Sequence, residues 1–415
     1  MKLIVLADDL TGSLDTGIQF VAGKANTRVV LDPTYPLASV DAKVQVLVVD
    51  TESRHLPPEK AAELVTHIVR QAAELKVPYI YKKTDSALRG NVGAELAAAL
   101  KASGAQQLHF IPAFPKTKRS TENGMQLITG TPVAESVFGK DPFNPVKHSA
   151  VAEILAEQTD VKVINRKLGE DLTTQAGIVV YDAVTDEDIL AWTKKIHSAG
   201  TMQVLSGCAG FATALPKVID LSGALPVEQQ PTSAFFVACG SVNPITVAQL
   251  HEAEGHGFKH YYLGLEQLLA KDFPTAGAIE QAVETVAATL GKGQNCILDT
   301  NTKPGEKPAE EYAKEHGLNM TELGKVISAH MGLTIKKLLE KKPDATMLIT
   351  GGDTLMGFMQ AEHISEIVPV KEVSTGTVLS LITIGGKTYN IISKSGGFGD
   401  KNLLAEVAKV VVTKR

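Results

Sequence analysis

The hydrophobic pattern of the first half of the chain alternates between short, continuous apolar runs and longer stretches with helical spacing. The apolar runs predict buried strands, and the amphipathic stretches predict helices between them. The expected strands are 3–7, 28–31, 45–50, 79–82, 108–111, 177–181 and 202–205. The expected helices are 58–75, 92–102, 151–158 and 187–197. This alternation of buried strands and helices is typical of a mostly parallel sheet.

The stretch 221–233 interrupts this alternation, because it is rich in Pro, Gly, Gln and Ser and has no periodicity. After it the pattern starts again. Strands are expected at 234–238, 260–263, 296–299, 345–350 and 389–394, and helices at 279–290, 309–316, 322–340 and 403–412. We therefore predict an α/β protein of two domains, residues 1–225 and 226–415, each a mostly parallel sheet flanked by helices. The length of 415 residues agrees, since single cores seldom grow beyond ~250–300 residues.

Composition narrows the function classes. Apolar residues make up 44% and charged residues 21% of the chain, and the net charge is only −5. These values favour a cytoplasmic protein of small-molecule metabolism, with neither a nucleic acid nor a membrane as its partner. The three cysteines lie far apart among small or apolar residues, so we expect buried thiols and no disulfides. Edge strands of the predicted sheets would allow a homodimer.

The segment 112–145 is irregular for a compact domain. It carries the basic residues Lys116, Lys118 and Arg119, and its apolar pattern predicts a hairpin over 125–135 that turns near Thr129 and Gly130. Irregular segments of this kind in compact domains usually serve as lids or binding loops.

Polar side chains gather where the N-terminal strands are expected to end. Asp8 and Asp9 follow the first strand, and Arg54 follows the third. The loop after the fourth strand carries Lys82, Lys83, Thr84, Asp85, Ser86 and Arg89. Because ligands bind at the carboxyl ends of strands in open α/β sheets, these residues predict a pocket for a small ligand with a carboxylate and hydroxyls. Two alternatives stay open: Asp9 only caps the following helix, or the second loop is an ordinary charged surface loop.

Glycine-rich turns follow strands of the second half. Ser241 follows the first of them, Gly351, Gly352, Asp353 and Thr354 follow the strand 345–350, and Gly396, Gly397, Phe398 and Gly399 follow the last strand. Glycines let backbone N–H groups approach phosphate oxygens, although a short strand-to-helix turn also needs glycine for steric reasons. The chain contains neither GxxxxGK[ST] nor GxGxxG, and it lacks the His and Cys spacing of zinc sites.

Five separated motifs together carry a resemblance. The start ADDLTGSLDTG, the segment TESR, the loop YKKTDSALRGN, and the turns TGGDT and SKSGGFG resemble, in order, the four-carbon acid-sugar kinase family. The resemblance implies a sugar-acid-binding N-terminal domain, a nucleotide-binding C-terminal domain and an active site in the cleft between them. It implies ATP-dependent phosphorylation of the terminal (4-) hydroxyl of a four-carbon sugar acid. The form of the second loop is most similar to the members acting on D-threonate, with D-erythronate and 3-oxo-tetronate as alternatives.

The resemblance also assigns residues. Asp9, Arg54, Lys82, Lys83, Thr84, Asp85, Ser86 and Arg89 match the substrate-contacting motifs. Ser241, Gly351, Gly352, Asp353, Thr354, Gly396, Gly397, Phe398 and Gly399 match the nucleotide-contacting ones.

Asp9 or Asp85 is expected to act on the attacking hydroxyl, with Asp353 as a competitor, and ATP is expected with Mg²⁺ whose ligands the sequence does not identify. Two other function classes stay open. One is a sugar-acid sensor that has lost turnover, and the other is an NAD(P)-dependent oxidoreductase, which the missing GxGxxG disfavours.

Overall fold

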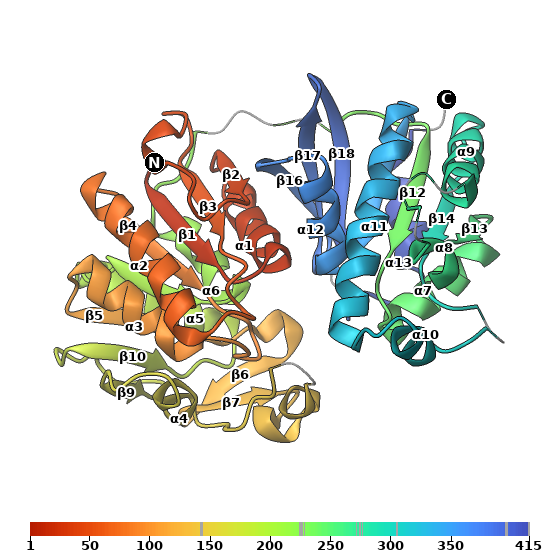
Figure 1. The fold of residues 1–415 in the computed structure, drawn as a ribbon. Coiled ribbons are helices and arrows are strands. Elements are labelled where there is room, and N and C mark those ends of the chain that lie inside the picture. The colour runs from red at the N-terminus through yellow and green to blue at the C-terminus, as the bar shows by residue number, and fades with distance from the viewer. Residues whose placement is uncertain are drawn as a thin grey trace. The chain divides into compact units, whose positions relative to one another are not determined.

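The computed structural model folds as two units, Met1–Pro226 and Val227–Arg415. It describes residues 1–141, 144–223, 227, 229–270, 272–273, 275, 277–303, 306–394 and 397–413. Figure 1 shows both units as sheets flanked by helices, which confirms the predicted fold class.

The sheet of the first unit is parallel and has the strand order β2-β3-β1-β4-β11-β5-β10-β9. The strands are β1 (Leu3–Ala7), β2 (Thr27–Val30), β3 (Val46–Asp50), β4 (Tyr79–Lys83), β5 (Gln107–Ile111), β9 (Val163–Arg166), β10 (Gly177–Tyr181) and β11 (Val204–Gly207). Every residue of β1, β3, β5 and β10 is buried. Burial on both faces explains the continuous apolar runs in the sequence. Edge strand β9, which is only partly buried, lacks this signal and was missed.

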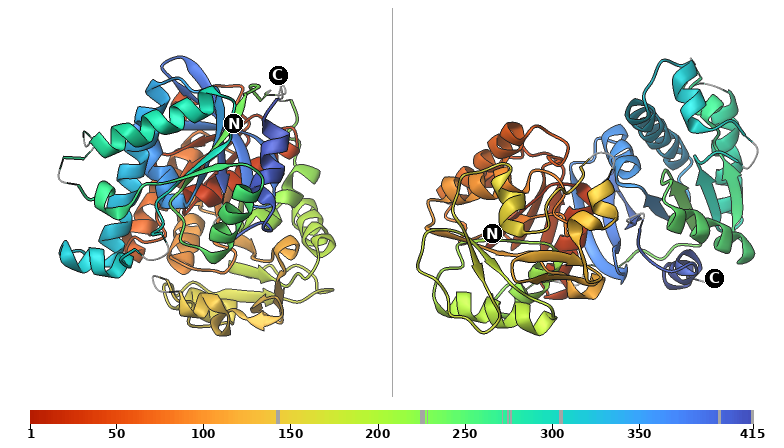
Figure 2. Two further views of the ribbon diagram at one scale, coloured as in Figure 1. Left: turned by 90° about the vertical axis from the view of Figure 1, so that its right-hand side faces the viewer. Right: turned by 90° about the horizontal axis from the view of Figure 1, so that it is seen from below.

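Helices cover both faces of this sheet, as Figures 1 and 2 show. Those on one face are α2 (Pro58–Glu74), α3 (Val92–Ser103) and α4 (Val151–Ala156), and those on the other are α1 (Leu10–Ala22), α5 (Asp186–Ser198) and α6 (Ala209–Ala214). The core below α2 and α3 includes Ile4, Leu6, Leu47 and Val49 from the two central strands. This packing fixes the ends of β1, β3 and β4 beside one another.

A small antiparallel sheet in the order β6-β7-β8 occupies the irregular segment. Strands β7 (Met125–Ile128) and β8 (Thr131–Pro132) form the predicted hairpin, with Thr129 and Gly130 as the turn. The first strand, β6 (Arg119–Glu122), was not predicted, because its residues Arg-Ser-Thr-Glu have no apolar alternation.

The sheet of the second unit has the order β13-β14-β12-β15-β18-β17-β16, parallel from β13 to β18 and antiparallel at β17 and β16. The strands are β12 (Ala234–Cys239), β13 (Lys259–Tyr262), β14 (Cys296–Asp299), β15 (Ala345–Thr350), β16 (Glu366–Ser374), β17 (Thr377–Ile384) and β18 (Lys387–Lys394). Its helices are α7 (Pro244–Gly255), α8 (Leu265–Leu268), α9 (Gly277–Gly291), α10 (Ala309–Glu315), α11 (Met320–Glu340), α12 (Gly352–Ala361) and α13 (Leu403–Val411).

Two differences from the sequence prediction concern this second sheet. Strand β16 was missed, and it contains Pro369 and two register shifts that break a regular alternation. Helix α12 begins at Gly352, so the residues predicted as a turn form its first helical turn.

All three cysteines are free and buried, as expected. Within the described ranges, no helix is both long and apolar enough to span a bilayer.

Candidate active site

Asp9 lies where strand β1 passes into helix α1. Its backbone is extended, with φ −153°, and its Oδ1 accepts a hydrogen bond from the backbone N–H of Gly12 at 2.9 Å. Asp9 is therefore the N-cap of α1, as the simpler alternative required. A Cβ on Gly12 would lie 2.4 Å from Asp9 Oδ1 and 2.7 Å from Lys83 Nζ. Glycine at this position thus lets a carboxylate and an ammonium approach the first turn of the helix together.

Arg54 joins the acids that follow different strands. Ala7 is in register with Asp50 on β3 and with Lys83 on β4, so the residues after these strands adjoin. The Arg54 Nε donates to Asp8 Oδ2 at 2.7 Å, and its Nη1 donates to Asp9 Oδ2 at 2.9 Å. Its Nη2 lies 3.9 Å from Asp85 Oδ1. Asp9 therefore has a second role beyond capping.

The neighbouring carboxylates keep the guanidinium of Arg54 protonated. Burial alone would lower the pKa of the guanidinium, but the carboxylates of Asp8, Asp9 and Asp85 raise that pKa well above its ordinary value. Asp9, Arg54 and Asp85 therefore form a row of alternating charges at the carboxyl edge of the sheet. We call it the charged row.

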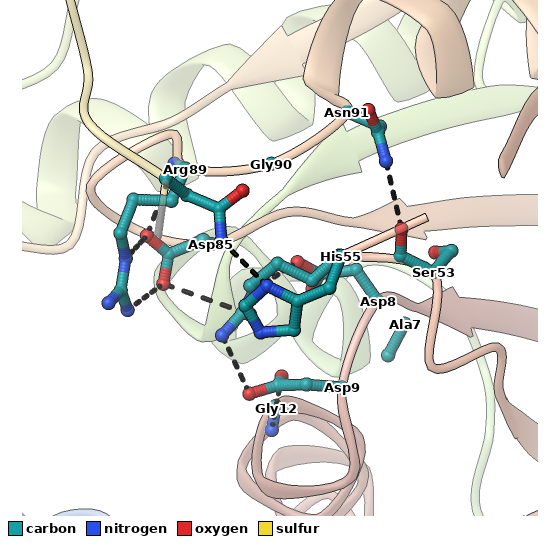
Figure 3. Close-up of polar contacts among 12 residues, drawn as sticks. Ala7, Asp8, Asp9, Gly12, Ser53, His55, Asp85, Arg89, Gly90 and Asn91 are labelled. Carbon is teal, nitrogen blue, oxygen red and sulfur yellow. Dashed lines mark hydrogen bonds and ion pairs between the residues drawn. The ribbon is translucent and has the colours of Figure 1, made fainter. Parts of the chain in front are cut away.

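Arg89 forms a bidentate ion pair with Asp85, as Figure 3 shows. The Nε and Nη2 of Arg89 donate to the two Asp85 oxygens at 2.9 and 3.0 Å, and Nη1 donates to Asp141 at 3.0 Å. The left-handed backbone of Leu88 and Gly90, with φ of 63° and 87°, turns the loop so that Arg89 returns onto Asp85. Burial would raise the pKa of Asp85, but Arg89 and Arg54 hold it well below its usual value.

Lys82 is more deeply buried than Asp9, Arg54 and Asp85. Its side chain is fully buried, and its Nζ lies 3.0 Å from Glu95 Oε2 and donates to the carbonyl of Lys83 at 2.7 Å. Glu95, in the first turn of α3, also accepts from the Ser53 hydroxyl. Direct contact of Lys82 with a substrate stays a prediction, and the buried pair gives this lysine a structural task of its own. Sequence reasoning missed Glu95, whose signal is a single acid within the Ala-rich run VGAELAAAL.

Lys83 differs from its neighbour. Its side chain is only 4% exposed, yet no described residue hydrogen-bonds or ion-pairs with its ammonium. Within the part of the chain that is described, the hydroxyl of Thr84 and Oδ1 of Asp8 are also buried without a partner. Buried polar groups are normally satisfied. The ammonium of Lys83 lies at the N-terminus of α1, where it suits an anionic group, and the unpaired hydroxyl and carboxylate oxygen suit the polar groups of a ligand.

Three more residues that sequence reasoning left unassigned hold the loops together. Asn91 donates to the carbonyls of Ser53 and Leu56, each at 2.8 Å, as Figure 3 shows for Ser53. Asp141 receives Arg89, and Arg119 Nη1 donates to the hydroxyl of Ser86. For Asn91, the only signal in the sequence is its place in the Arg89–Asn91 tripeptide of the loop YKKTDSALRGN. The other two come from the irregular segment, whose position the sequence does not specify.

The second unit brings two of its predicted segments together at the ends of β12 and β15. The backbone N–H of Gly240 donates to the Thr350 carbonyl at 3.1 Å, and a Cβ on Gly240 would lie 1.9 Å from Thr354 Oγ1. Gly351 has φ 104°, which glycine alone adopts readily. Ser241 accepts from the N–H of Asn243 at 3.3 Å. The N-terminus of α12, with Gly352 and Asp353 exposed, follows directly.

The last glycine turn is held by helix α7. Gln249 Nε2 donates to the carbonyls of Phe398 and Asp400 at 3.0 and 2.8 Å. A Cβ on Gly397 would lie 3.8 Å from the Asn243 side chain, so this turn adjoins the Ser241 loop. The predicted Gly396 lies outside the described residues. Helix N-termini and open glycine backbones supply N–H donors that suit phosphate oxygens, so these residues fit a nucleotide.

Across the described residues, no group of three or more His, Cys, Asp or Glu side chains could hold a metal ion.

Comparisons with known proteins agree with this division. Residues 3–215 match the family model of a sugar-binding N-terminal domain, and residues 236–404 match that of a nucleotide-binding C-terminal domain. The chain is 30% identical to a D-threonate kinase of Salmonella typhimurium, over 98% of this chain and 97% of the relative. It is 25% identical to a D-erythronate kinase of Heliobacterium modesticaldum, over 100% of this chain and 98% of the relative. A solved structure titled a putative tRNA synthase from Salmonella typhimurium LT2 shares the fold, with a TM-score of 0.82, 19% identity and coverage of 99% and 100%.

Proposed function

We propose that this chain, which belongs to the four-carbon acid sugar kinase family, transfers the γ-phosphoryl group of ATP to the terminal hydroxyl of D-threonate. The observation that carries the proposal is the row Asp9, Arg54 and Asp85 in the sugar-binding unit, with Lys83 beside it. Carboxylates accept from sugar hydroxyls and cations bind an acid group, so one site offers both contacts that a sugar acid needs. D-Erythronate and 3-oxo-tetronate are the alternative substrates.

Asp9 is the better candidate to orient the attacking hydroxyl. Arg89 and Arg54 lower the pKa of Asp85, which makes its carboxylate a weak base. Asp9 is more open, since its side chain is 26% exposed against 11% for Asp85. In our account Asp9 accepts the hydroxyl proton or fixes its direction, while Asp85 with Arg89 shapes the pocket wall.

Lys83 and the N-terminus of α1 supply positive potential beside Asp9. Phosphoryl transfer depends mainly on positioning and on charge stabilisation, and this is what these groups offer. The nucleotide is held in the second unit by the turns at Ser241, Gly351–Thr354 and Gly397–Gly399. Mg²⁺ bound with ATP would neutralise phosphate charge, and Asp353 is an exposed acid within the turn Gly351–Thr354 itself.

The test is ADP release with Mg-ATP against D-threonate, D-erythronate, L-threonate and 3-oxo-tetronate, with a control lacking any acid. Turnover with D-threonate in excess of the other acids supports the proposal. Turnover that prefers another acid of the panel keeps the reaction class and replaces the substrate. ATP binding without turnover of any of the four acids contradicts the proposal and favours a sensor.

A further inference from the structure

The cations of the sugar-binding unit differ in how their charge is balanced. Arg54 is paired with Asp8 and Asp9, Arg89 with Asp85 and Asp141, and Lys82 with Glu95. A guanidinium that already pairs with two carboxylates has few free N–H donors and little net positive charge for a third carboxylate. Lys83 has no such partner among the described residues, but it lies beside Asp9, so a substrate carboxylate bound away from Asp9 needs a further cation.

Arg119, on strand β6 of the small sheet, is such a cation. No ion pair joins its guanidinium to an acid within the described ranges. Its Nε is buried and lacks a hydrogen-bond partner among the same residues, whereas its Nη1 donates to the Ser86 hydroxyl. The side of the guanidinium formed by Nε and Nη2 is the side that binds a carboxylate with two parallel hydrogen bonds, and none of the described residues occupies it.

The surroundings hold this guanidinium in place. Its central carbon lies 5.3 Å from the centre of the Phe138 ring, which also receives Arg89 at 5.2 Å, and Ser86 fixes Nη1. Stacking and one hydrogen bond limit the rotamers of Arg119 before a ligand arrives, so less entropy is lost on binding. A buried N–H donor without an acceptor is energetically unfavourable, and an incoming carboxylate would satisfy it.

Its position along the site is also suitable. Ser86 directly follows Asp85, and the Arg119 charge contributes to the lowered pKa of Asp85. Asp85 faces Arg54, which in turn holds Asp9. Along this series of contacts, Arg119 is therefore next to Asp85, whereas Asp9 is at the far end.

We propose that Arg119 recognises the carboxylate of the acid substrate through Nε and Nη2, so that the terminal hydroxyl points to Asp9 at the opposite end. This inference rests on the proposed function and adds the direction in which the substrate lies. It makes Arg119 the residue that separates acids from neutral polyols and amides.

The experiment compares D-threonate with D-threonamide, in which an amide replaces the carboxylate. Arg119→Met should lower kcat/KM for D-threonate roughly 10²-fold, mainly through KM, because hydrogen bonds to a charged group are lost. The same variant should change kcat/KM for D-threonamide by less than about 3-fold. Arg119→Lys keeps the charge without the planar fork and should recover only part of the preference.

Lys118→Met is the matched control, since it removes an exposed positive charge from the neighbouring position of the same segment. It should keep the acid-to-amide preference of the unaltered protein. Calorimetric binding of D-threonate in the absence of nucleotide gives a readout independent of turnover, and Arg119→Met should weaken it roughly 10²-fold as well.

If Arg119→Met keeps the preference for acid over amide, or binds D-threonate as tightly as the Lys118→Met control, the inference is wrong. If Arg119→Met does not fold, Arg119→Lys decides, and an unchanged preference in that variant also overturns it. Failure of the proposed function is a separate result, because the unaltered protein would then show no acid-dependent ADP release at all.

Discussion

Individual acids in the sugar-binding unit carry the same charge but different chemistry. Asp85 is locked by Arg89 and its pKa is lowered, whereas Asp9 is more exposed and shares Arg54 with Asp8. The sequence identified both residues, but it offered no ground to choose between them. The choice depends on the fork of Arg89, which requires the left-handed turn at Leu88 and Gly90.

We expect Asp9→Asn to lower kcat by roughly 10²-fold or more, the usual scale for a lost acid-base group. Asparagine can still cap α1 through its side-chain oxygen, so folding should be retained. Steady-state kinetics measure the effect, and thermal melting checks the fold. Asp186→Asn, an exposed acid in the first turn of α5, is the control. Turnover within a few-fold of the unaltered enzyme would remove Asp9 from the catalytic role.

A second prediction at this scale concerns His109, which is 1% exposed on strand β5. Its Nε2 lies 3.1 Å from the Thr201 carbonyl and its Nδ1 lies 2.7 Å from the Tyr181 hydroxyl, which fits a neutral ring that donates to the first and accepts from the second. Burial lowers the pKa of His109 to about 4. Between that pH and an unfolded value of about 6.5, the unfolded chain binds the additional proton, so stability falls as the pH falls.

The contribution of His109 to stability should therefore be roughly 2 kcal/mol smaller at pH 5 than at pH 7.5. Chemical denaturation at the two pH values measures it, with His109→Gln as the reference that cannot titrate. The unaltered protein should lose more stability than the variant on acidification. Equal losses in both would show that His109 does not titrate in this way.

At the scale of elements, strand β4 and helix α3 are joined by the buried pair of Lys82 and Glu95. Lys82→Met should destabilise the protein by about 3–5 kcal/mol, because Glu95 is then left buried without its cation. The double variant Lys82→Met/Glu95→Leu should recover most of this loss. Denaturant unfolding curves of the single and double variants provide the measurement.

The double variant also tests whether Lys82 contacts the substrate. If Lys82 acts only beneath the site, the folded double variant should bind and turn over the acid with a KM within a few-fold of the unaltered value. If the KM for the acid instead rises by about an order of magnitude or more, the result supports direct contact, as the sequence resemblance implies.

Element prediction succeeded where burial is continuous. Strands β1, β10, β14 and β15 have the bounds expected from their apolar runs. It failed for β6, β9 and β16, which are polar, partly exposed or irregular. The missed strand β6 is also the element that carries Arg119. Contacts that depend on such a segment cannot be derived from local periodicity, because its position is set by tertiary packing.

At the scale of the whole molecule, the first unit matches a sugar-binding domain and the second a nucleotide-binding domain. The glycine turns belong to the second unit and the charged row to the first. Gly351→Ala should raise the KM for ATP roughly 10-fold, because φ 104° is strained for alanine by about 1–3 kcal/mol. The KM for the acid should stay within about 2-fold. Gly324→Ala on α11, where a Cβ meets open space, is the control and should change neither value.

Initial rates over a grid of ATP and acid concentrations give both KM values. A change in the KM for the acid as large as that for ATP would contradict this division. The division itself was visible in the sequence, since the motifs of the two kinds lie on opposite sides of the stretch 221–233.

The central claim is that a phosphoryl group moves to the terminal hydroxyl of a four-carbon acid, and the product tests it most directly. Proton-coupled ³¹P NMR of the product from D-threonate and Mg-ATP measures which carbon carries the ester. Our account predicts a new phosphomonoester signal split by the two protons on C4. Splitting by a single proton would place the ester on C2 or C3, and the absence of any new ester signal would contradict the kinase itself.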